Sequence, residues 1–139
     1  MPPVIEVRDL VKSYGGSRAV DGLTFSVEPG ELFGILGPNG AGKTTALEIV
    51  EGLRKADGGE VRLLDTPPWP RNLDLCRRIG VQLQSSAFFE KLTAREQLRT
   101  FSSLYGVHDA RVDEMLDLVG LADKAGERED RLSGGQRQR

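Results

Sequence analysis

The stretch "LFGILGPNGAGKTTALEIVEGL", residues Leu32 to Leu53, decides the fold class of this chain. Its start at residues 32–36 is a short apolar run next to glycines, which predicts a strand buried on both faces of a mostly parallel sheet. A glycine-rich turn follows, and residues 43–50 are good helix formers with Gly52 placed as a C-cap. A buried strand, a glycine-rich turn and a helix in this order predict an α/β fold.

The glycine-rich turn completes the pattern G-x-x-x-x-G-K-[ST] of a P-loop. Without a Cβ, glycine lets successive amide N–H groups face inward around phosphate oxygens, and the following helix directs its positive dipole end to the same point. Lys43 would contact the β- and γ-phosphates, and the Thr44 hydroxyl would bind Mg²⁺. The predicted nucleotide contacts of this loop are Gly37, Pro38, Asn39, Gly40, Ala41, Gly42, Lys43, Thr44 and Thr45. The loop alone does not separate kinases, GTPases and transport ATPases.

Composition narrows the class of protein further. Nineteen basic against twenty-one acidic residues give a net charge of −2, so we expect no nucleic-acid partner. The single cysteine, Cys76, favours a reducing compartment, and no segment approaches the roughly 18 consecutive apolar residues of a membrane span. We therefore expect a cytoplasmic chain. Its 139 residues are enough for one domain, so we expect one folding unit or part of one.

Strand and helix patterns flank the P-loop. "VIEVRDLVKSY" and "AVDGLTFSV", joined by "GGSR", predict an N-terminal antiparallel hairpin. "GEVRLLD" and "IGVQLQ" predict further strands, and "NLDLCRRI" predicts a short helix between them. We expect residues 1–84 to hold this β part together with the P-loop core.

Two helices are predicted in the second part of the chain. Thr93 and Glu96 have the spacing of a capping box, and the helix they begin should end near Gly106. Apolar residues at helical spacing then predict a second helix, which Gly120 and Leu121 should close. Because these helices follow a strand directly, residues 85–135 are expected to form an α-helical subdomain beside the α/β core.

The chain closes on "DRLSGGQRQR", in which residues 132–136 resemble the signature motif of ATP-binding cassette (ABC) ATPases. Ser133 is a natural N-cap and Gln136 stands three residues later, so a helix should begin at Gly134 with its amides open to an anion. With the P-loop and this motif in order, the whole chain resembles the first part of one cassette with the P-loop NTPase fold. The resemblance is closest to ATP-binding subunits of bacterial multidrug-type and ABC-2-type exporters.

The resemblance implies a function and a set of roles. The protein would be an ATP-hydrolysing subunit that drives a transporter, bound to a transmembrane permease subunit on the inner face of the cell membrane. Two subunits would form a head-to-tail dimer, with ATP held between the P-loop of one and Ser133, Gly134, Gly135 and Gln136 of the other. Tyr14 would stack on adenine, and Lys43 and Gln84 would be the catalytic residues. Gln84 would bind Mg²⁺ together with Thr44 and report the nucleotide state to the permease, although Gln82 lies on the same strand face and stays an alternative.

Three parts of a complete cassette cannot be placed in this sequence. The family has the Walker B strand with its Asp, the catalytic Glu and the switch His after the signature motif, so the chain resembles a cassette truncated before that strand. We therefore expect the 139 residues alone to be inactive as an ATPase, and their "SGGQRQR" end to be frayed or held by a neighbour instead of docked. Two alternatives stay open: a cassette ATPase of translation or DNA repair, and a catalytically incomplete nucleotide-binding fragment.

Overall fold

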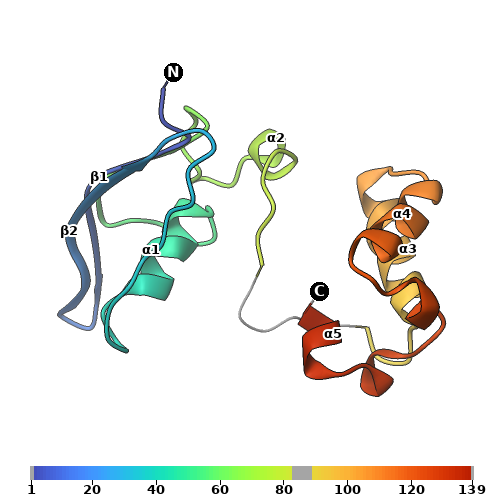
Figure 1. The fold of residues 1–139 in the computed structure, drawn as a ribbon. Helices are drawn as coiled ribbons and strands as arrows, with labels where there is room; N and C mark the ends of the chain where they lie inside the picture. The colour runs from blue at the N-terminus through green and yellow to red at the C-terminus, as the bar shows by residue number, and fades with distance from the viewer. Residues whose placement is uncertain (1, 83–88, 139) are drawn as a thin grey trace. The chain divides into compact units, whose positions relative to one another are not determined.

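The protein is described by a computed structural model that covers residues 2–82 and 89–138 (Figure 1). The chain divides into two compact units, Met1–Val81 and Gln82–Arg139. Within the described residues, no helix has the length and apolar character needed to cross a membrane. The first unit carries the P-loop and the second carries the signature motif.

The first unit contains a three-stranded antiparallel sheet of order β2-β1-β3. Its strands are β1 (Ile5–Tyr14), β2 (Ser17–Val27) and β3 (Gly58–Leu63). Gly15 and Gly16 form the turn between β1 and β2 with φ of 52° and 85°, values that favour glycine. The predicted hairpin is therefore confirmed, and the predicted strand at "GEVRLLD" pairs with β1.

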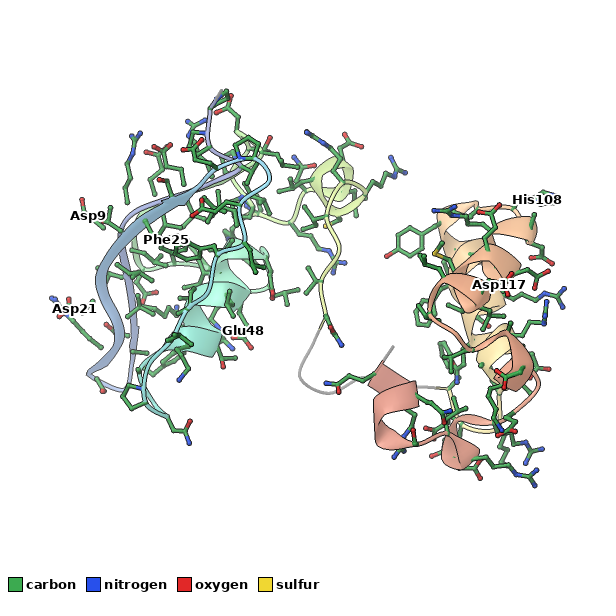
Figure 2. All side chains as sticks on the ribbon, viewed as in Figure 1. Asp9, Asp21, Phe25, Glu48, His108 and Asp117 are labelled. Atoms are coloured by element: carbon green, nitrogen blue, oxygen red, sulfur yellow. The ribbon has the colours of Figure 1, made fainter. Side chains whose placement is uncertain are left out.

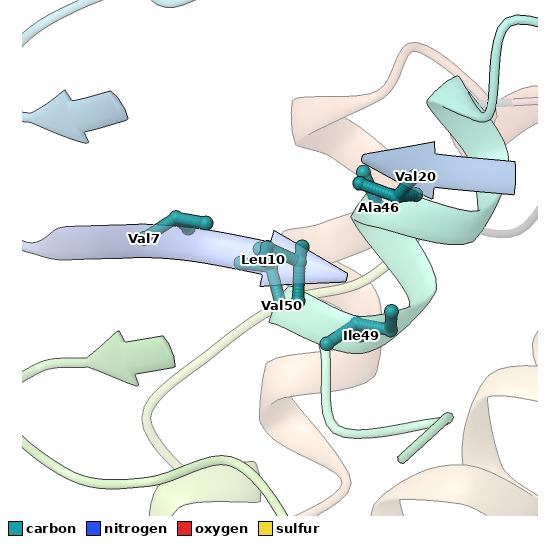
Figure 3. Packing of buried hydrophobic residues seen from close by; sticks show 6 residues of the cluster. All are labelled: Val7, Leu10, Val20, Ala46, Ile49 and Val50. Atoms are coloured by element: carbon teal, nitrogen blue, oxygen red, sulfur yellow. The ribbon is translucent and has the colours of Figure 1, made fainter. Parts of the chain in front are cut away.

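Helix α1 (Lys43–Val50) packs on this sheet and forms the core of the first unit. Three residues of the helix are buried at helical spacing against three residues of the hairpin (Figure 3). These six are Ala46, Ile49 and Val50 on α1 and Val7, Leu10 and Val20 on the strands. Gly52, with φ of 73°, ends the helix as predicted, and the Leu53 amide donates to the carbonyl of Glu48 at 2.8 Å.

The strand expected at residues 32–36 is not formed. Leu32 is fully exposed and Leu36 is 95% exposed, whereas Phe33 stacks on Phe25 of β2 with the ring centroids 4.9 Å apart. A strand buried on both faces exists only where neighbouring strands supply its hydrogen bonds. Among the described residues, the strands pair with one another and none pairs with this segment. The prediction from the apolar run was therefore wrong for this structure.

The segment after β3 is only partly regular. Helix α2 (Leu73–Cys76) confirms the predicted short helix, and the Asn72 side chain caps it by accepting from the amides of Asp74 and Leu75. The strand expected at "IGVQLQ" is absent from its described part, residues 79–82, and the rest of it lies outside the described residues.

The second unit contains helices α3 (Ala94–Tyr105), α4 (Ala110–Leu118) and α5 (Gly134–Gln138). Two short 3₁₀ helices, Ala122–Lys124 and Glu129–Arg131, lie between α4 and α5. A small core of α4 and the turn after it is formed by Val112, Leu116, Leu121 and Ala125.

The predicted ends of α3 and α4 are confirmed. The Thr93 amide donates to the Glu96 carboxylate at 2.8 Å and the Glu96 amide donates to the Thr93 hydroxyl at 3.3 Å, which completes the capping box. The bond from the Thr93 amide, together with a second bond from the Thr93 hydroxyl to the Glu96 carboxylate at 2.8 Å, lowers the pKa of the Glu96 side chain. Gly106 and Gly120 close the two helices with φ of 66° each, and the Leu121 amide donates back to the carbonyl of Leu116 at 2.8 Å.

Gly42 ends the P-loop at a point where the chain lies directly against β2. A Cβ at this position would be 1.9 Å from the carbonyl oxygen of Ala19 and 3.3 Å from Cγ2 of Val20. Gly42 also has a left-handed backbone, with φ of 80°. Glycine therefore meets two separate requirements at position 42, the backbone conformation and the close approach to β2.

Replacing Gly42 by alanine should destabilise the protein more than the same change at Gly40. Gly40 has nearly the same φ, 84°, but an added Cβ there meets nothing within 4 Å. Gly40→Ala should therefore cost only the left-handed backbone, about 1–2 kcal/mol. Gly42→Ala should cost about 1–3 kcal/mol more, because the loop must move away from β2. Urea unfolding of the two full-length variants measures this difference, and equal losses of stability would contradict the close packing of Gly42 on Ala19.

Candidate nucleotide-binding site

The P-loop is a tight turn that runs into the first turn of α1. Gly40 and Gly42 both adopt left-handed conformations, and the Ala41 amide donates to the carbonyl of Pro38 at 3.3 Å. The Ala46 amide then makes the first helical hydrogen bond, 2.9 Å to the carbonyl of Gly42. Because Gly42 has no side chain, no N-cap side chain bonds to the first amides of α1. This geometry fits an anion at the start of α1.

Lys43 directs its charge into the same turn. Its Nζ donates to the carbonyl oxygens of Gly37 and Pro38, each at 2.7 Å. The ammonium and the positive end of the helix dipole therefore lie at one place. A phosphate oxygen is a stronger acceptor for an ammonium than a neutral carbonyl, so a polyphosphate fits this lysine.

The remaining P-loop residues lie mostly at the surface. The whole turn at residues 37–41 is exposed, which includes Pro38, Asn39 and Ala41. Thr44 is exposed in the first turn of α1 and Thr45 is half-buried. A hydroxyl at the second helical position is of the oxygen-ligand type that Mg²⁺ prefers, so the donor set fits this ion.

Tyr14 lies at the end of β1, where it pairs with Ser17 across the hairpin. Its side chain is 43% exposed. Ala19, the residue that Gly42 approaches, is two positions after Ser17 on β2. The end of the hairpin that carries Tyr14 is therefore also the part of the sheet that supports the end of the P-loop.

Two cations lie over the Tyr14 ring. The Lys12 ammonium and the Arg54 guanidinium are each 5.5 Å from the ring centroid. Lys12 is paired with Asp57 at 2.7 Å, and the Ser13 amide also donates to this carboxylate at 2.8 Å. The bond from Lys12, followed by that from Ser13, lowers the pKa of Asp57.

Arg54 has its own acidic partner. Its Nε donates to the Glu48 carboxylate at 2.7 Å, and this bond raises the pKa of the guanidinium. Glu48 belongs to α1 (Figure 2). Sequence reasoning did not find Glu48, Arg54 or Asp57, because no local pattern shows that the segment after α1 folds back onto β1. The Asp57 amide, which donates to the carbonyl of Val11 at 2.9 Å, fixes that return.

The signature motif lies in the second unit and begins α5. The Ser133 amide donates to the Gln136 side chain at 2.9 Å, and the Gln136 amide donates to the Ser133 hydroxyl at 3.2 Å. The predicted cap is therefore confirmed, and the expectation of a frayed end was wrong as far as Gln138. Gly134 and Gly135 are exposed, and a Cβ at either position would meet nothing within 4 Å.

The predicted glutamine contact to Mg²⁺ stays a prediction. Gln84 lies outside the described residues. The alternative residue, Gln82, is exposed, and its Nε2 donates to the carbonyl of Gln138 at 3.2 Å.

The sequence of this chain is similar to those of known proteins. Residues 20–139 match the family model described as ABC transporter. The chain is 40% identical to Nod factor export ATP-binding protein I of Burkholderia thailandensis, over 97% of this chain and 46% of that protein. It is 35% identical to the bacitracin transport ATP-binding protein BcrA of Bacillus licheniformis, over 100% of this chain and 46% of that protein. Spermidine/putrescine import ATP-binding protein PotA of Pseudomonas aeruginosa is 36% identical, over 99% of this chain and 39% of that protein.

The solved structures that resemble the chain have the same fold. A structure described as the ATP binding subunit of an ABC transporter superposes with a TM-score of 0.82 at 26% identity, over 97% of this chain and 58% of that chain. The chain spans less than half the length of the three curated relatives. The family match nevertheless covers most of this chain and includes both the P-loop and the signature motif. The chain therefore belongs to the ABC transporter family and carries part of an ATP-binding subunit with the P-loop NTPase fold.

Proposed function

We propose that the full-length protein is the ATP-hydrolysing, energy-coupling subunit of a membrane transporter. The observation that carries this proposal is the Lys43 ammonium, held 2.7 Å from two P-loop carbonyls at the start of α1. The capped signature helix downstream and the transport functions named for the relatives support it. Export is the direction that we propose, because identity to the Nod factor export proteins, up to 42%, exceeds the 36% identity to the import protein PotA.

The P-loop residues would bind and polarise the phosphates of ATP. The backbone N–H groups of residue 37 and of residues 39–45 would surround the phosphate oxygens, and Lys43 would neutralise charge on the β- and γ-phosphates. Thr44 and Gln84 would hold Mg²⁺, which supplies further positive charge to the same oxygens when it is bound. Tyr14 would stack on the adenine base through its exposed ring.

A second copy of the protein would complete the site. The residues 133–136 of one subunit would meet the γ-phosphate that the P-loop of the other subunit holds, in a head-to-tail dimer. The open approach to Gly134 and Gly135 supports this role, because a phosphate must come close to the main chain there. A transmembrane permease subunit would bind the helical second unit, with the protein on the cytoplasmic face of the membrane.

The nucleotide site is tested by changing Lys43 and Tyr14 separately. Lys43→Ala should abolish ATP hydrolysis and severely weaken the binding of both ATP and inorganic tripolyphosphate, since it removes the charge that meets the phosphates. Tyr14→Ala should weaken ATP about tenfold and leave tripolyphosphate nearly unchanged, since the lost stacking concerns the base alone. Competition binding to the full-length protein measures both ligands. Hydrolysis that survives Lys43→Ala would refute the proposed function.

The dimer is tested at the signature motif. Gly135→Asp places a carboxylate at the start of α5, so it should repel the γ-phosphate of the partner and block dimer formation. ATP binding to the monomer should stay within about twofold of the parent, because the P-loop is unchanged. Gly126→Asp is the matched control, since Gly126 is also exposed and open to an added Cβ. Light scattering with a non-hydrolysable ATP analogue should show dimers for the parent and the control only, and dimers of Gly135→Asp would contradict the role of the motif.

A further inference from the structure

The Tyr14 ring is connected to the P-loop helix through two side chains. Arg54 lies over the ring at 5.5 Å, and its Nε is held by Glu48, which follows Lys43 by five residues on α1. The connection therefore runs from the hairpin end, through the guanidinium, to the helix that begins at the P-loop. At the other end of α1, Gly42 fixes the distance to Ala19 on the same hairpin.

The two cations over the ring have different connections. Lys12 precedes Tyr14 by two residues on β1, so the two side chains leave the same face of one strand. Lys12 and its partner Asp57 therefore support the ring from its own strand. Arg54, in contrast, joins the ring to a different element, and a planar guanidinium can lie over an aromatic ring while its Nε keeps a carboxylate partner.

We propose that Arg54 is a positioning residue that fixes the Tyr14 ring relative to the P-loop and so sets how much the adenine base contributes to nucleotide affinity. This inference rests on the proposed function, because it assigns Arg54 to the base side of that same site. A nucleotide contacts the ring and the loop at once, so its base stacks well only where the ring already lies at the correct distance and angle. Arg54 acts through Tyr14 and does not itself need to touch the phosphates.

The direct test is a double-mutant cycle between Tyr14 and Arg54 in the full-length protein. The binding of ATP and of inorganic tripolyphosphate is measured for the parent, Arg54→Met, Tyr14→Ala and the double variant. Arg54→Met keeps an unbranched side chain but removes the guanidinium and its charge, and it should weaken ATP about three- to tenfold. Tripolyphosphate should change less than about twofold, and Arg54→Met should have no further effect once Tyr14 is alanine.

Three further variants separate positioning from general structural damage. Arg54→Lys keeps the charge without the planar group, so its ATP affinity should lie between that of the parent and that of Arg54→Met. Glu48→Gln should weaken ATP in the same direction, because it loosens the hold on Arg54. Arg62→Met is the matched control, since Arg62 lies on β3 and pairs with Glu60 and Asp65, and it should leave both affinities unchanged.

Two results would overturn the inference while the proposed function stands. One is equal weakening of ATP and tripolyphosphate by Arg54→Met, and the other is an unchanged effect of Arg54→Met in the Tyr14→Ala background. If Tyr14→Ala binds ATP as tightly as the parent does, adenine does not stack on Tyr14. That result would refute the base site of the proposed function and also the role of Arg54. The Tyr14→Ala variant therefore distinguishes the two failures.

Discussion

The close approach of Gly42 to the carbonyl oxygen of Ala19 is the contact on which the first unit depends. A side chain at position 42 would push the start of α1 away from β2. Ala46 on α1 would then lose its packing with Val20 on β2. The same contact holds the P-loop turn at the end of the hairpin that carries Tyr14. The glycine at position 42 thus affects the packing of the core, the shape of the anion site and the position of the Tyr14 ring.

The starts of α1 and α5 are built in two different ways. At α1 the N-cap is glycine, so the amides of the first turn meet no capping side chain. At α5 the Ser133 hydroxyl accepts from the Gln136 amide, which fixes the turn while the amides of Gly134 and Gly135 stay exposed. In the proposed function the first arrangement would receive a phosphate inside the P-loop, and the second would meet a phosphate held by a partner subunit.

The parts of this structure that the sequence predicted are those decided by neighbouring residues. The hairpin turn at Gly15 and Gly16, the P-loop turn, and the caps at Thr93 and Ser133 depend on spacings of at most a few residues. The apolar run at 32–36 was misread because a buried strand depends on distant partners, and no described strand pairs with it. The link between Arg54 and Tyr14 also joins residues far apart in sequence, so no pattern predicted it.

The most direct test of this account is the structure of the full-length protein with Mg²⁺ and a non-hydrolysable ATP analogue. We expect the triphosphate inside the turn at residues 37–44, with the base stacked on Tyr14. Lys43 Nζ should then have left the carbonyl oxygens of Gly37 and Pro38, which it contacts at 2.7 Å, for a β- or γ-phosphate oxygen. An analogue bound elsewhere, with Lys43 still on both carbonyls, would contradict the account.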